Sequence, residues 1–422
     1  MASPTDPAIT IPLFGPAMLD DPYPVYRRLR ETDPVHWHEP FGAWVLTRYH
    51  DVVAALHDPR FSSERTAAMQ EMAGQPGLKP FFDFLATRML YADPPRHTRL
   101  RGLVSKAFTP HAIEAMRPHI QALVDQFLDG VQPQGRMDII ADLAYPLPVT
   151  VIVEMLGVPV EDRDRLKRWS DEFIVYFSKD PAQVTPEEYD RAARAVAAEE
   201  GYFRAAVARL HGGAKPGLLG AMARVEEADD RLTEQELYAN TNLLLTAGHE
   251  TTTNLIGNGV LALLRHPAEL EKLRADPSLL PAAIEEFLRY DSPVQFTHRV
   301  AKEDVSVGDK LIRRGQFVYL MLGAANRDPA RFPDPDHLDV TRKDNHHLSF
   351  GQGPHFCLGA PLARLEAQTV FGTLLRRFPS LRLATDRLEY RQTFNLHGLQ
   401  ALPVLFGIGS GRKRGRGENG AG

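Results

Sequence analysis

The sequence predicts a mainly α-helical fold with small β-sheets. Helical periodicity covers most of the interior of the chain, and the prolines fall mainly between the periodic stretches. Alternating residues at 34–47 are typical of a β-hairpin, and shorter strand-like segments follow at 298–319 and 380–405. Besides the helices discussed below, we expect helices at the following ranges: 21–32, 49–58, 95–108, 110–129, 161–178 and 186–211.

Length and composition favour one continuous domain. The 422 residues would allow two to three domains of about 150 residues each. However, no internal repeat or Pro/Ser/Gly-rich linker interrupts the chain. We expect an irregular N-terminal segment at 1–20, a single domain at 21–406 and a disordered tail at 407–422. The tail is rich in glycine and basic residues, and it has too little apolar surface to fold.

Composition also excludes several classes of protein. The 49 basic and 54 acidic side chains give a net charge of −5, whereas nucleic-acid-binding proteins usually carry a basic excess. A single cysteine permits no intrachain disulfide, multi-cysteine zinc site or iron–sulfur cluster, and it fits a reducing compartment. The longest apolar stretch, 255–264, is far shorter than the roughly 18 residues of a membrane span. We expect a cytoplasmic protein with no nucleic-acid or membrane partner.

A long helix with a weak middle is predicted after residue 232. Thr233 and Glu236 form a capping box, and no proline follows until Pro267, about thirty residues later. At about 1.5 Å per residue, this helix spans about 45 Å, enough to cross a whole domain. Its centre, 247–253, contains a glycine and three threonines, which are poor helix formers. Threonine hydroxyls can also bond back to the helix carbonyls.

Two interpretations of this centre remain open on the residues alone. It is either a tolerated irregular stretch with Glu250 at the surface, or a place where another group packs against the helix. In the second case, Glu250 beside Thr251 could relay protons into a closed pocket. A zinc-protease motif is excluded, because His249-Glu250 is followed by Thr253 where the second histidine would stand.

The only cysteine, Cys357, lies in the most informative stretch of the chain. Three glycines, at positions 351, 353 and 359, surround it and permit close backbone approach. A helical pattern begins just after Cys357 and runs to Phe378, so the sulfur lies at a helix N-terminus, where the thiolate is favoured over the thiol. A thiolate in such a loop suits axial coordination of haem iron. The alternative for a lone cysteine is a small buried apolar residue.

Taken together, these segments resemble one family. Phe350-Gly-x-Gly-x-His-x-Cys357-x-Gly is similar to the haem-thiolate signature of the cytochrome P-450 family at every usual position. Ala247-Gly-His-Glu-Thr251 resembles the oxygen-activating segment of the central helix, and Glu286-Phe-Leu-Arg289 resembles the E-x-x-R motif. Arg342 matches the arginine that completes this ion-pair cluster, and Asn326-Arg-Asp-Pro329 is typical of soluble bacterial members. The resemblance covers roughly residues 20–405.

The resemblance implies a haem-thiolate monooxygenase with a long central helix over haem b. Such an enzyme inserts one oxygen atom from O2 into its substrate. Cys357 would be the axial ligand of the iron, Glu250 would relay protons, and Thr251 would hold a water and the bound oxygen by hydrogen bonds. Phe350 would pack against the sulfur side of the haem. The basic residues that match the family's propionate ligands are His97, Arg101, Arg299 and His355.

The resemblance also reverses the interpretation of Glu286 and Arg289. From their spacing alone, they would be a solvated helix pair of little energetic value. In the family, the equivalent residues and Arg342 form a buried structural lock behind the cysteine loop.

The substrate is expected to be a bulky apolar small molecule of the polyketide, terpenoid, steroid or fatty acyl class. The sequence cannot choose among these classes. The expected pocket is large and apolar, and its expected lining residues are Met89, Leu90, Leu243, Ala247, Val294, Phe296 and Leu396.

No reductase module is recognisable in the sequence, so electrons are expected from a separate ferredoxin and its reductase. Arg364, Arg376 and Arg377 are candidates for the ferredoxin-binding face, with solvated helix charges as the alternative. We expect a monomer. Two other functions are open: a peroxide-driven variant of the enzyme, and a haem carrier or sensor that does not turn over. The Glu250–Thr251 pair argues against both.

Overall fold

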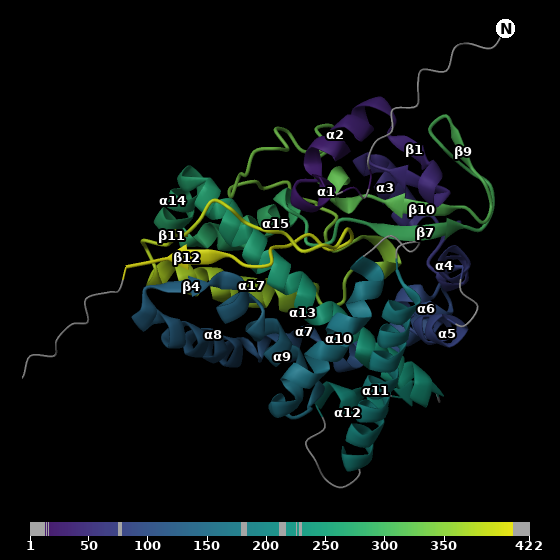
Figure 1. Ribbon diagram of the computed structural model, residues 1–422, viewed down its shortest axis with the longest axis horizontal. Helices are drawn as coiled ribbons and strands as arrows, with labels where there is room; N and C mark the ends of the chain where they lie inside the picture. The colour runs from purple at the N-terminus through teal and green to yellow at the C-terminus, as the bar shows by residue number, and fades with distance from the viewer. Residues whose placement is uncertain are drawn as a thin grey trace, which may run out of the picture.

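The structure, a computed structural model, confirms the mainly α-helical class (Figure 1). It describes residues 13, 15, 17–74, 78–178, 184–210, 217–224, 226–227 and 230–407. The helices are α1 (Ala17–Asp20), α2 (Tyr23–Thr32), α3 (Tyr49–His57), α4 (Thr66–Ala73), α5 (Lys79–Ala86), α6 (Arg96–Ala107), α7 (Pro110–Glu114), α8 (Arg117–Val131), α9 (Pro146–Leu156), α10 (Arg163–Ser178), α11 (Pro186–Leu210), α12 (Gly217–Arg224), α13 (Glu234–Arg265), α14 (Pro267–Ala275), α15 (Leu280–Tyr290), α16 (Leu322–Ala325) and α17 (Ala360–Arg377).

Within the described residues, the strands form one five-stranded sheet and three smaller ones. In the large sheet the order is β1-β2-β10-β7-β3, with only β2 and β10 parallel. A three-stranded sheet has the order β11-β12-β4, and β5-β6 and β8-β9 are separate pairs. The strands are β1 (Val35–His38), β2 (Ala43–Leu46), β3 (Phe61–Ser62), β4 (Arg136–Asp138), β5 (Glu226–Glu227), β6 (Asp230–Arg231), β7 (Thr297–Ala301), β8 (Val305–Val307), β9 (Lys310–Ile312), β10 (Phe317–Leu320), β11 (Arg382–Leu383) and β12 (Pro403–Leu405).

Prolines begin several of these helices, as their positions between periodic stretches predicted. Pro110, Pro146 and Pro267 each occupy the first position of a helix, where the missing N–H is not needed. The predicted helix at 110–129 was wrong in one respect. It is divided into α7 and α8, with Ala115 and Met116 between them, because Pro118 opens a new helix there.

The ends of the chain lie partly outside the described residues. Of the N-terminal segment expected to be irregular, Ala17–Asp20 form a single helical turn. Residues 1–12, 14 and 16 are not described, and of the predicted tail only Gly407 is.

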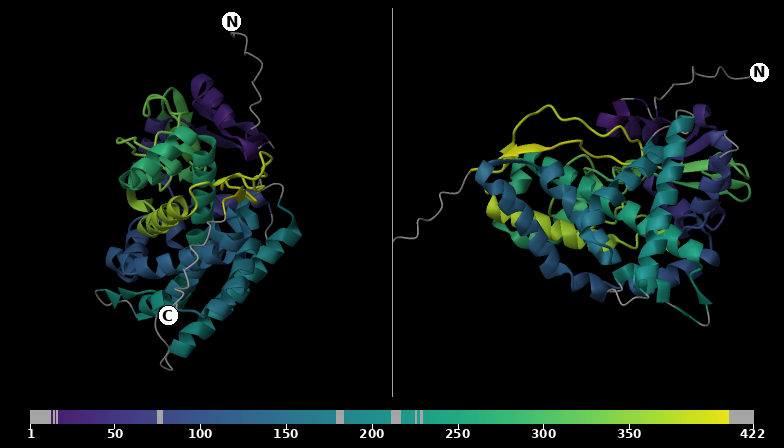
Figure 2. Two further views of the ribbon diagram at one scale, coloured as in Figure 1. Left: turned by 90° about the vertical axis from the view of Figure 1, so that its left-hand side faces the viewer. Right: turned by 60° about the horizontal axis from the view of Figure 1, so that its bottom comes forward.

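The long predicted helix is present as α13, which has 32 residues. The side chain of Thr233 accepts a hydrogen bond from the N–H of Glu236, and the carboxylate of Glu236 accepts one from the N–H of Thr233, so the capping box is complete. Figures 1 and 2 show α13 in the middle of the molecule, with α2, α3 and the large sheet on one side and α8 to α12 on the other. No helix in the described ranges, α13 included, has the length and apolar character to cross a membrane.

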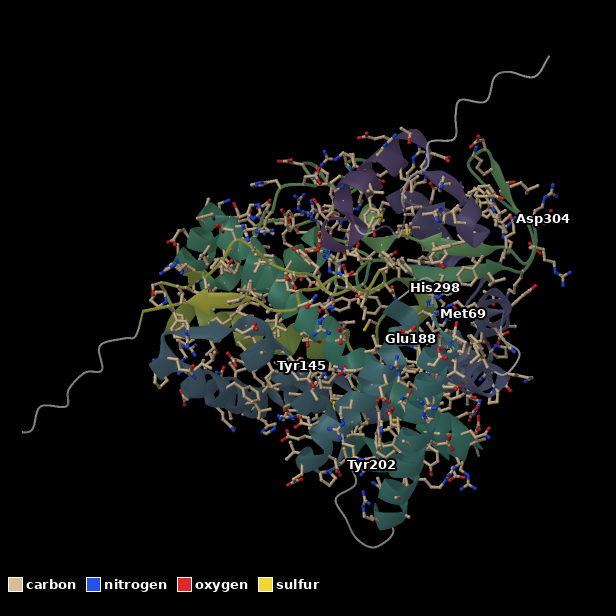
Figure 3. The ribbon with its side chains drawn as sticks, in the orientation of Figure 1. Met69, Tyr145, Glu188, Tyr202, His298 and Asp304 are labelled. Atoms are coloured by element: carbon tan, nitrogen blue, oxygen red, sulfur yellow. The ribbon has the colours of Figure 1, made fainter. Side chains whose placement is uncertain are left out.

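The core surrounds α13 and the large sheet. One hydrophobic cluster joins α13 to its neighbouring helices, among them α8, α9, α15 and α17. A second lies beside the large sheet and includes Met69 of α4 together with Phe317 and Tyr319 of β10. The ring of His298 on β7, labelled in Figure 3, lies with its centre 5.1 Å from that of Phe317 and 5.7 Å from that of Tyr319. Residues of α4 and of the large sheet therefore belong to one hydrophobic cluster.

We predict that Gly259→Ala destabilises the protein at the crossing of α13 with α15 and α17. A Cβ atom at position 259 would lie 2.7 Å from the ring of Phe371 and 2.9 Å from that of Phe287. Overpacking of this kind typically costs about 1–3 kcal/mol of unfolding free energy. Denaturant titration measures the change. The matched control is Gly201→Ala in α11, where nothing lies within 4 Å, and where the change should stabilise by about 0.5–1 kcal/mol. Equal effects of the two substitutions would contradict the close packing at Gly259.

Candidate active site

A cavity of about 300 Å³ lies beside the centre of α13 and brings together residues from distant parts of the chain. Its wall includes the cysteine loop, the start of α6, the first residues of β7 and η3 (Met89–Tyr91). Most of the lining surface is apolar. The predicted site residues that line it are Met89, Leu90, His97, Arg101, Leu243, Ala247, Thr251, Val294, Arg299, Phe350, His355 and Cys357.

The backbone of the cysteine loop is fixed by its own hydrogen bonds. The N–H of Cys357 donates to the carbonyl of Phe350 at 2.8 Å, and the N–H of Gly351 donates to Leu348 at 2.7 Å. Gly351 and Gly353 have φ values of 67° and 69°, a left-handed conformation that favours glycine. This geometry explains the glycines of the motif. It directs the Cys357 side chain to the cavity, where it remains accessible.

Basic side chains gather at one wall of the cavity. Arg299 is only 4% exposed, and burial lowers its pKa to about 9. The ring of His97 lies 4.0 Å from that of His355, whose pKa falls to about 3 through burial and the neighbouring positive charges. In the described part of the chain, neither Arg299 nor Arg101 forms an ion pair with a carboxylate. Arg299 thus carries a buried charge that no described carboxylate pairs with, and such a charge needs an anionic partner.

The Asp93 carboxylate is the acidic group that acts on this wall. It raises the pKa of His97, Arg299 and His355 against the effect of burial. However, Asp93 is already engaged, since it accepts hydrogen bonds from Ser62 at 2.6 Å and from Lys302 at 3.2 Å. Its single charge does not neutralise the basic cluster.

Glu286 and Arg289 form a fully buried ion pair on α15. The two hydrogen bonds between them measure 2.7 and 2.8 Å, and both side chains are 0% exposed. Arg342 donates to the same Glu286 carboxylate at 3.1 Å, as do the side chain of Asn345 and the N–H of Asp339. The structure thus places the three predicted residues of the lock in direct contact. They lie outside the cavity wall.

Asn326 connects this cluster to the cysteine loop. Its side-chain amide donates to the hydroxyls of Ser292 and Ser349, at 2.7 and 2.9 Å, and its carbonyl accepts from the N–H of Leu348 at 2.7 Å. Its backbone carbonyl accepts a hydrogen bond from Arg289. The sequence offered Asn326 only as part of a family motif, without this role.

The centre of α13 divides its polar residues between two environments. Thr251 lines the cavity, and its hydroxyl donates to the carbonyl of Ala247 at 3.0 Å, as expected for a helical threonine. Glu250 is 5% exposed and is not part of the cavity wall. Its carboxylate is instead paired with Arg391, a partner that no sequence signal indicated. The interpretation of Glu250 as a surface residue was therefore wrong.

Two predicted pocket residues also lie elsewhere. Phe296 belongs to the core beside the large sheet and packs on Tyr319 with ring centres 5.2 Å apart. Leu396 forms a β-bridge with Val294 and packs against the same core. Several lining residues were missed: Leu244, Gly248, Thr252 and Leu255. Helical periodicity could have found these, because they lie on the same face of α13 as Ala247 and Thr251.

Comparisons with known proteins agree with this site. The family model described as cytochrome P-450 matches residues 214–389. The monooxygenase PikC of Streptomyces venezuelae is 42% identical over 97% of this chain and 97% of its own. The vitamin D(3) 25-hydroxylase of Pseudonocardia autotrophica is 42% identical over 94% of this chain and 96% of its own. The chain belongs to the cytochrome P-450 family.

The fold of a solved cytochrome P-450 matches as well. The crystal structure of P450BioI in complex with hexadec-9Z-enoic acid ligated acyl carrier protein is 39% identical. It has a TM-score of 0.87 and covers 93% of this chain and 99% of its own. The predicted family and fold are confirmed, and the protein is a monooxygenase that uses O2, redox partners and a haem-iron cofactor.

The residues present fit a haem group. Haem presents two anionic propionates, and the buried, carboxylate-free Arg299 is the partner that such a group needs. The sulfur of Cys357 is accessible in the same cavity and matches the family's iron ligand.

The surroundings of Cys357 act on its pKa in opposite directions. Burial raises the pKa of the thiol, while the N–H groups of Gly359 and Ala360 and the charges of Arg101 and Arg364 lower it. The N–H groups at the helix N-terminus favour the thiolate, as the sequence predicted, but burial outweighs them and the net shift of the pKa is upward. Coordination to iron would supply the missing stabilisation, because a metal-bound thiol loses its proton.

The predicted basic face near the cysteine loop is largely neutralised. Arg364 forms two hydrogen bonds of 2.7 Å with Glu285, and Arg377 is paired with Asp125 and Asp129. Arg376 is exposed and forms no ion pair with any described residue. Of the three candidate arginines, Arg376 has the charge most available to a partner.

We predict that Glu285 makes stability depend on acidic pH. Burial raises its pKa, but hydrogen bonds and charge from Arg364 and His347 outweigh burial and lower the pKa to about 2. Because the folded-state pKa lies below the ordinary value of 4.5, the stabilisation is present above about pH 4.5 and is lost as the pH falls toward 2. It amounts to about 3 kcal/mol at neutral pH. Measurement of the free energy of unfolding between pH 6 and pH 3.5 tests this dependence of stability on pH.

In this measurement, Glu285→Gln should be less stable than the wild type at pH 6, and the difference should shrink at pH 3.5. Glu271→Gln removes an exposed pair with Arg274 and is the control, with an expected change below about 1 kcal/mol. A constant difference between the Glu285 variant and the wild type over this range would contradict the assignment.

Proposed function

We propose that this protein hydroxylates a bulky apolar molecule, using haem b bound through Cys357. The observation that carries the proposal is that Cys357, the buried basic cluster and Thr251 share one largely apolar cavity. The chain 21–406 would form a single catalytic domain.

The basic cluster and the cysteine loop would hold the cofactor. Cys357 would ligate the iron, and Phe350 would pack on the sulfur side. Arg299, His97, Arg101 and His355 would bind the propionates. The burial of Arg299 and His97, and the absence of a carboxylate partner of Arg299 and Arg101 among the described residues, support this assignment. When bound, the haem supplies the activation of O2, with the thiolate donating electron density.

Thr251 and Glu250 would deliver protons to the cavity. The Thr251 hydroxyl, which now donates to a helix carbonyl, can instead donate into the cavity and hold a water there. Glu250 would supply the proton from behind the helix. Because its carboxylate is held by Arg391, this role requires the side chain to leave that ion pair and rotate toward Thr251.

The substrate class follows from the wall and from the relatives. Leu243, Ala247 and Val294 give the cavity an apolar surface that can orient a molecule only by shape. The names of two relatives refer to vitamin D(3) and to a fatty acid on an acyl carrier protein, both bulky and apolar. We propose a polyketide, terpenoid, steroid or fatty acyl substrate of secondary metabolism. A carrier or sensor function would leave Thr251 at the wall without a role.

The electrons would come from a separate ferredoxin and its reductase, and the enzyme would act as a cytoplasmic monomer. Arg376, in the last turn of α17, is our candidate for an ion pair with an acidic ferredoxin, because it is exposed and forms no ion pair with a described residue. Salt should weaken such a contact.

We predict a thiolate-type Soret band in the carbon monoxide difference spectrum of the reduced protein. Cys357→Ser should abolish this band, because serine oxygen is a poor ligand for haem iron. The control is Ser380→Ala, a surface position away from the cavity. A colourless wild-type protein, or an unchanged spectrum in the Cys357 variant, would contradict the proposal. Spectral titration with a compound library then identifies the substrate.

We predict that Thr251→Ala uncouples turnover, so that more peroxide is released per NAD(P)H consumed. The loss of the hydroxyl removes the proton path at the cavity wall, and such paths contribute about 10²–10⁴-fold to rates. Thr246→Ala is the control, because its hydroxyl also bonds to a helix carbonyl but it does not line the cavity. Thr251→Ser should restore coupling. Unchanged coupling in Thr251→Ala would exclude the role.

A further inference from the structure

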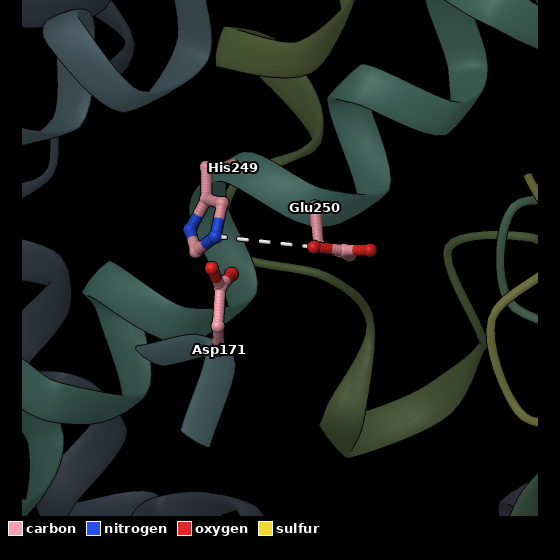
Figure 4. Close-up of side chains that lie close together, drawn as sticks. All are labelled: Asp171, His249 and Glu250. Carbon is pink, nitrogen blue, oxygen red and sulfur yellow. Dashed lines mark ion pairs between the residues drawn. The ribbon is translucent and has the colours of Figure 1, made fainter. Parts of the chain in front are cut away.

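Three side chains behind the centre of α13 point ligand atoms at one another (Figure 4). They are His249 and Glu250 of α13 and Asp171 of the neighbouring α10. One ligand atom from each residue lies within 4.8 Å of the other two, and His249 Nε2 is 4.0 Å from the nearer Glu250 oxygen. Among the described residues, no other group of three such side chains meets this distance.

One nitrogen of the His249 imidazole ring is hydrogen-bonded, and the other has no partner among the described residues. Its Nδ1 lies 2.9 Å from the carbonyl of Leu245, which can only accept, so Nδ1 carries the hydrogen. The other nitrogen, Nε2, therefore presents a lone pair in the neutral ring. It is buried in a side chain 1% exposed, and no described residue forms a hydrogen bond with it.

The cluster therefore brings three acceptors together with no donor among them. Arg391 and Lys167 bind the two carboxylates, so Nε2 of His249 is the acceptor of this cluster without a partner among the described residues. A buried acceptor without a partner is costly. A cation between the three atoms would bind Nε2 and both carboxylates at once.

Each of the three side chains is also held from its far side, as metal ligands in proteins usually are. The ring N–H of His249 is bound by Leu245, the Glu250 carboxylate is paired with Arg391, and the Asp171 carboxylate is paired with Lys167. Lys167 in turn lies 4.7 Å from the ring of Tyr145, labelled in Figure 3. The Asp171 side chain is 41% exposed and provides an entry path from solvent.

We propose that Asp171, His249 and Glu250 form a binding site for a divalent cation of the zinc class. Imidazole nitrogen with carboxylate oxygens is a ligand set that Zn²⁺ accepts, whereas Mg²⁺ and Ca²⁺ prefer oxygen ligands alone. Three protein ligands leave one tetrahedral position for water. Because Lys167 and Arg391 already neutralise the two carboxylates, the site should bind more weakly than a structural zinc site.

Occupation of this site would inhibit the enzyme. A metal ion bound to Glu250 holds the carboxylate behind α13, away from the cavity. The ion binding does not depend on any role of Glu250, but the inhibition rests on the proposed function, in which Glu250 supplies the proton.

Titration of the haem-loaded enzyme with zinc tests the site. Isothermal titration calorimetry measures the binding. We expect one saturable site in the wild type, and a zinc shell of one imidazole and oxygen ligands without sulfur in X-ray absorption at the zinc edge. Asp171→Asn and His249→Gln should each weaken binding about tenfold or more. Asp171→Asn is the safer variant, because its half-exposed position tolerates the change.

Two controls match the variants in chemistry. Asp164→Asn removes a 72% exposed carboxylate from the same helix, and His119→Gln removes a surface histidine that is paired with Glu154. Both should retain wild-type zinc affinity. The absence of saturable binding, sulfur in the zinc shell, or equal affinity of Asp171→Asn and the wild type would each overturn the proposal.

Turnover in the same titration separates the site from the role of Glu250. Zinc should slow O2-dependent turnover of the wild type more than that of Asp171→Asn, each relative to its zinc-free rate. The carbon monoxide spectrum should not change, because Cys357 is not involved. Zinc binding with the expected variant pattern but without inhibition would support the metal site and contradict the assignment of Glu250 as proton donor.

Discussion

The Glu286 carboxylate is the interaction on which the geometry of the active site depends. Two guanidinium groups, a side-chain amide and a backbone N–H donate to it in a place that water does not reach. Removing charges from water is expensive, and attraction between them compensates only when nearly every donor and acceptor is satisfied. This carboxylate meets that condition, so the loss of one partner would leave an uncompensated buried charge, with a typical cost of about 3–5 kcal/mol.

The same cluster fixes the position of the cysteine loop indirectly, through segments that lie between the two. Arg289 also donates to the carbonyls of Asn326 and Pro335, and so fixes two segments that lie 37 and 46 residues away in the chain. Asn326 then holds Ser349 and Leu348, directly before the loop of Phe350 and Cys357. The ion pair between Glu285 and Arg364 ties the same helix α15 to α17, which begins three residues after Cys357. The position of the sulfur thus depends on α15 through Asn326 and Arg364.

The sequence predicted those parts whose causes are local. The bounds of α13 follow from its capping box and Pro267, and the loop conformation follows from glycines at positive φ. Contacts between distant segments were not predictable in this way. Arg391 reaches Glu250 from 141 residues away, and Phe296, which directly precedes β7, packs in the core against Tyr319 of β10. For such residues the sequence shows which side chain is present, and only the packing of the folded chain determines which residue that side chain contacts.

The centre of α13 shows why one helix can serve both a cavity and a separate polar cluster. Successive residues on an α-helix are rotated by about 100°, and the cavity wall includes Thr251 and Thr252 but not Glu250. The Glu250 carboxylate instead lies beside Arg391, His249 and Asp171. A proton can pass from Glu250 to Thr251 only after the Glu250 side chain has rotated toward the cavity. Whatever holds the carboxylate on its own side, whether a guanidinium or a metal ion, consequently controls when that proton is available.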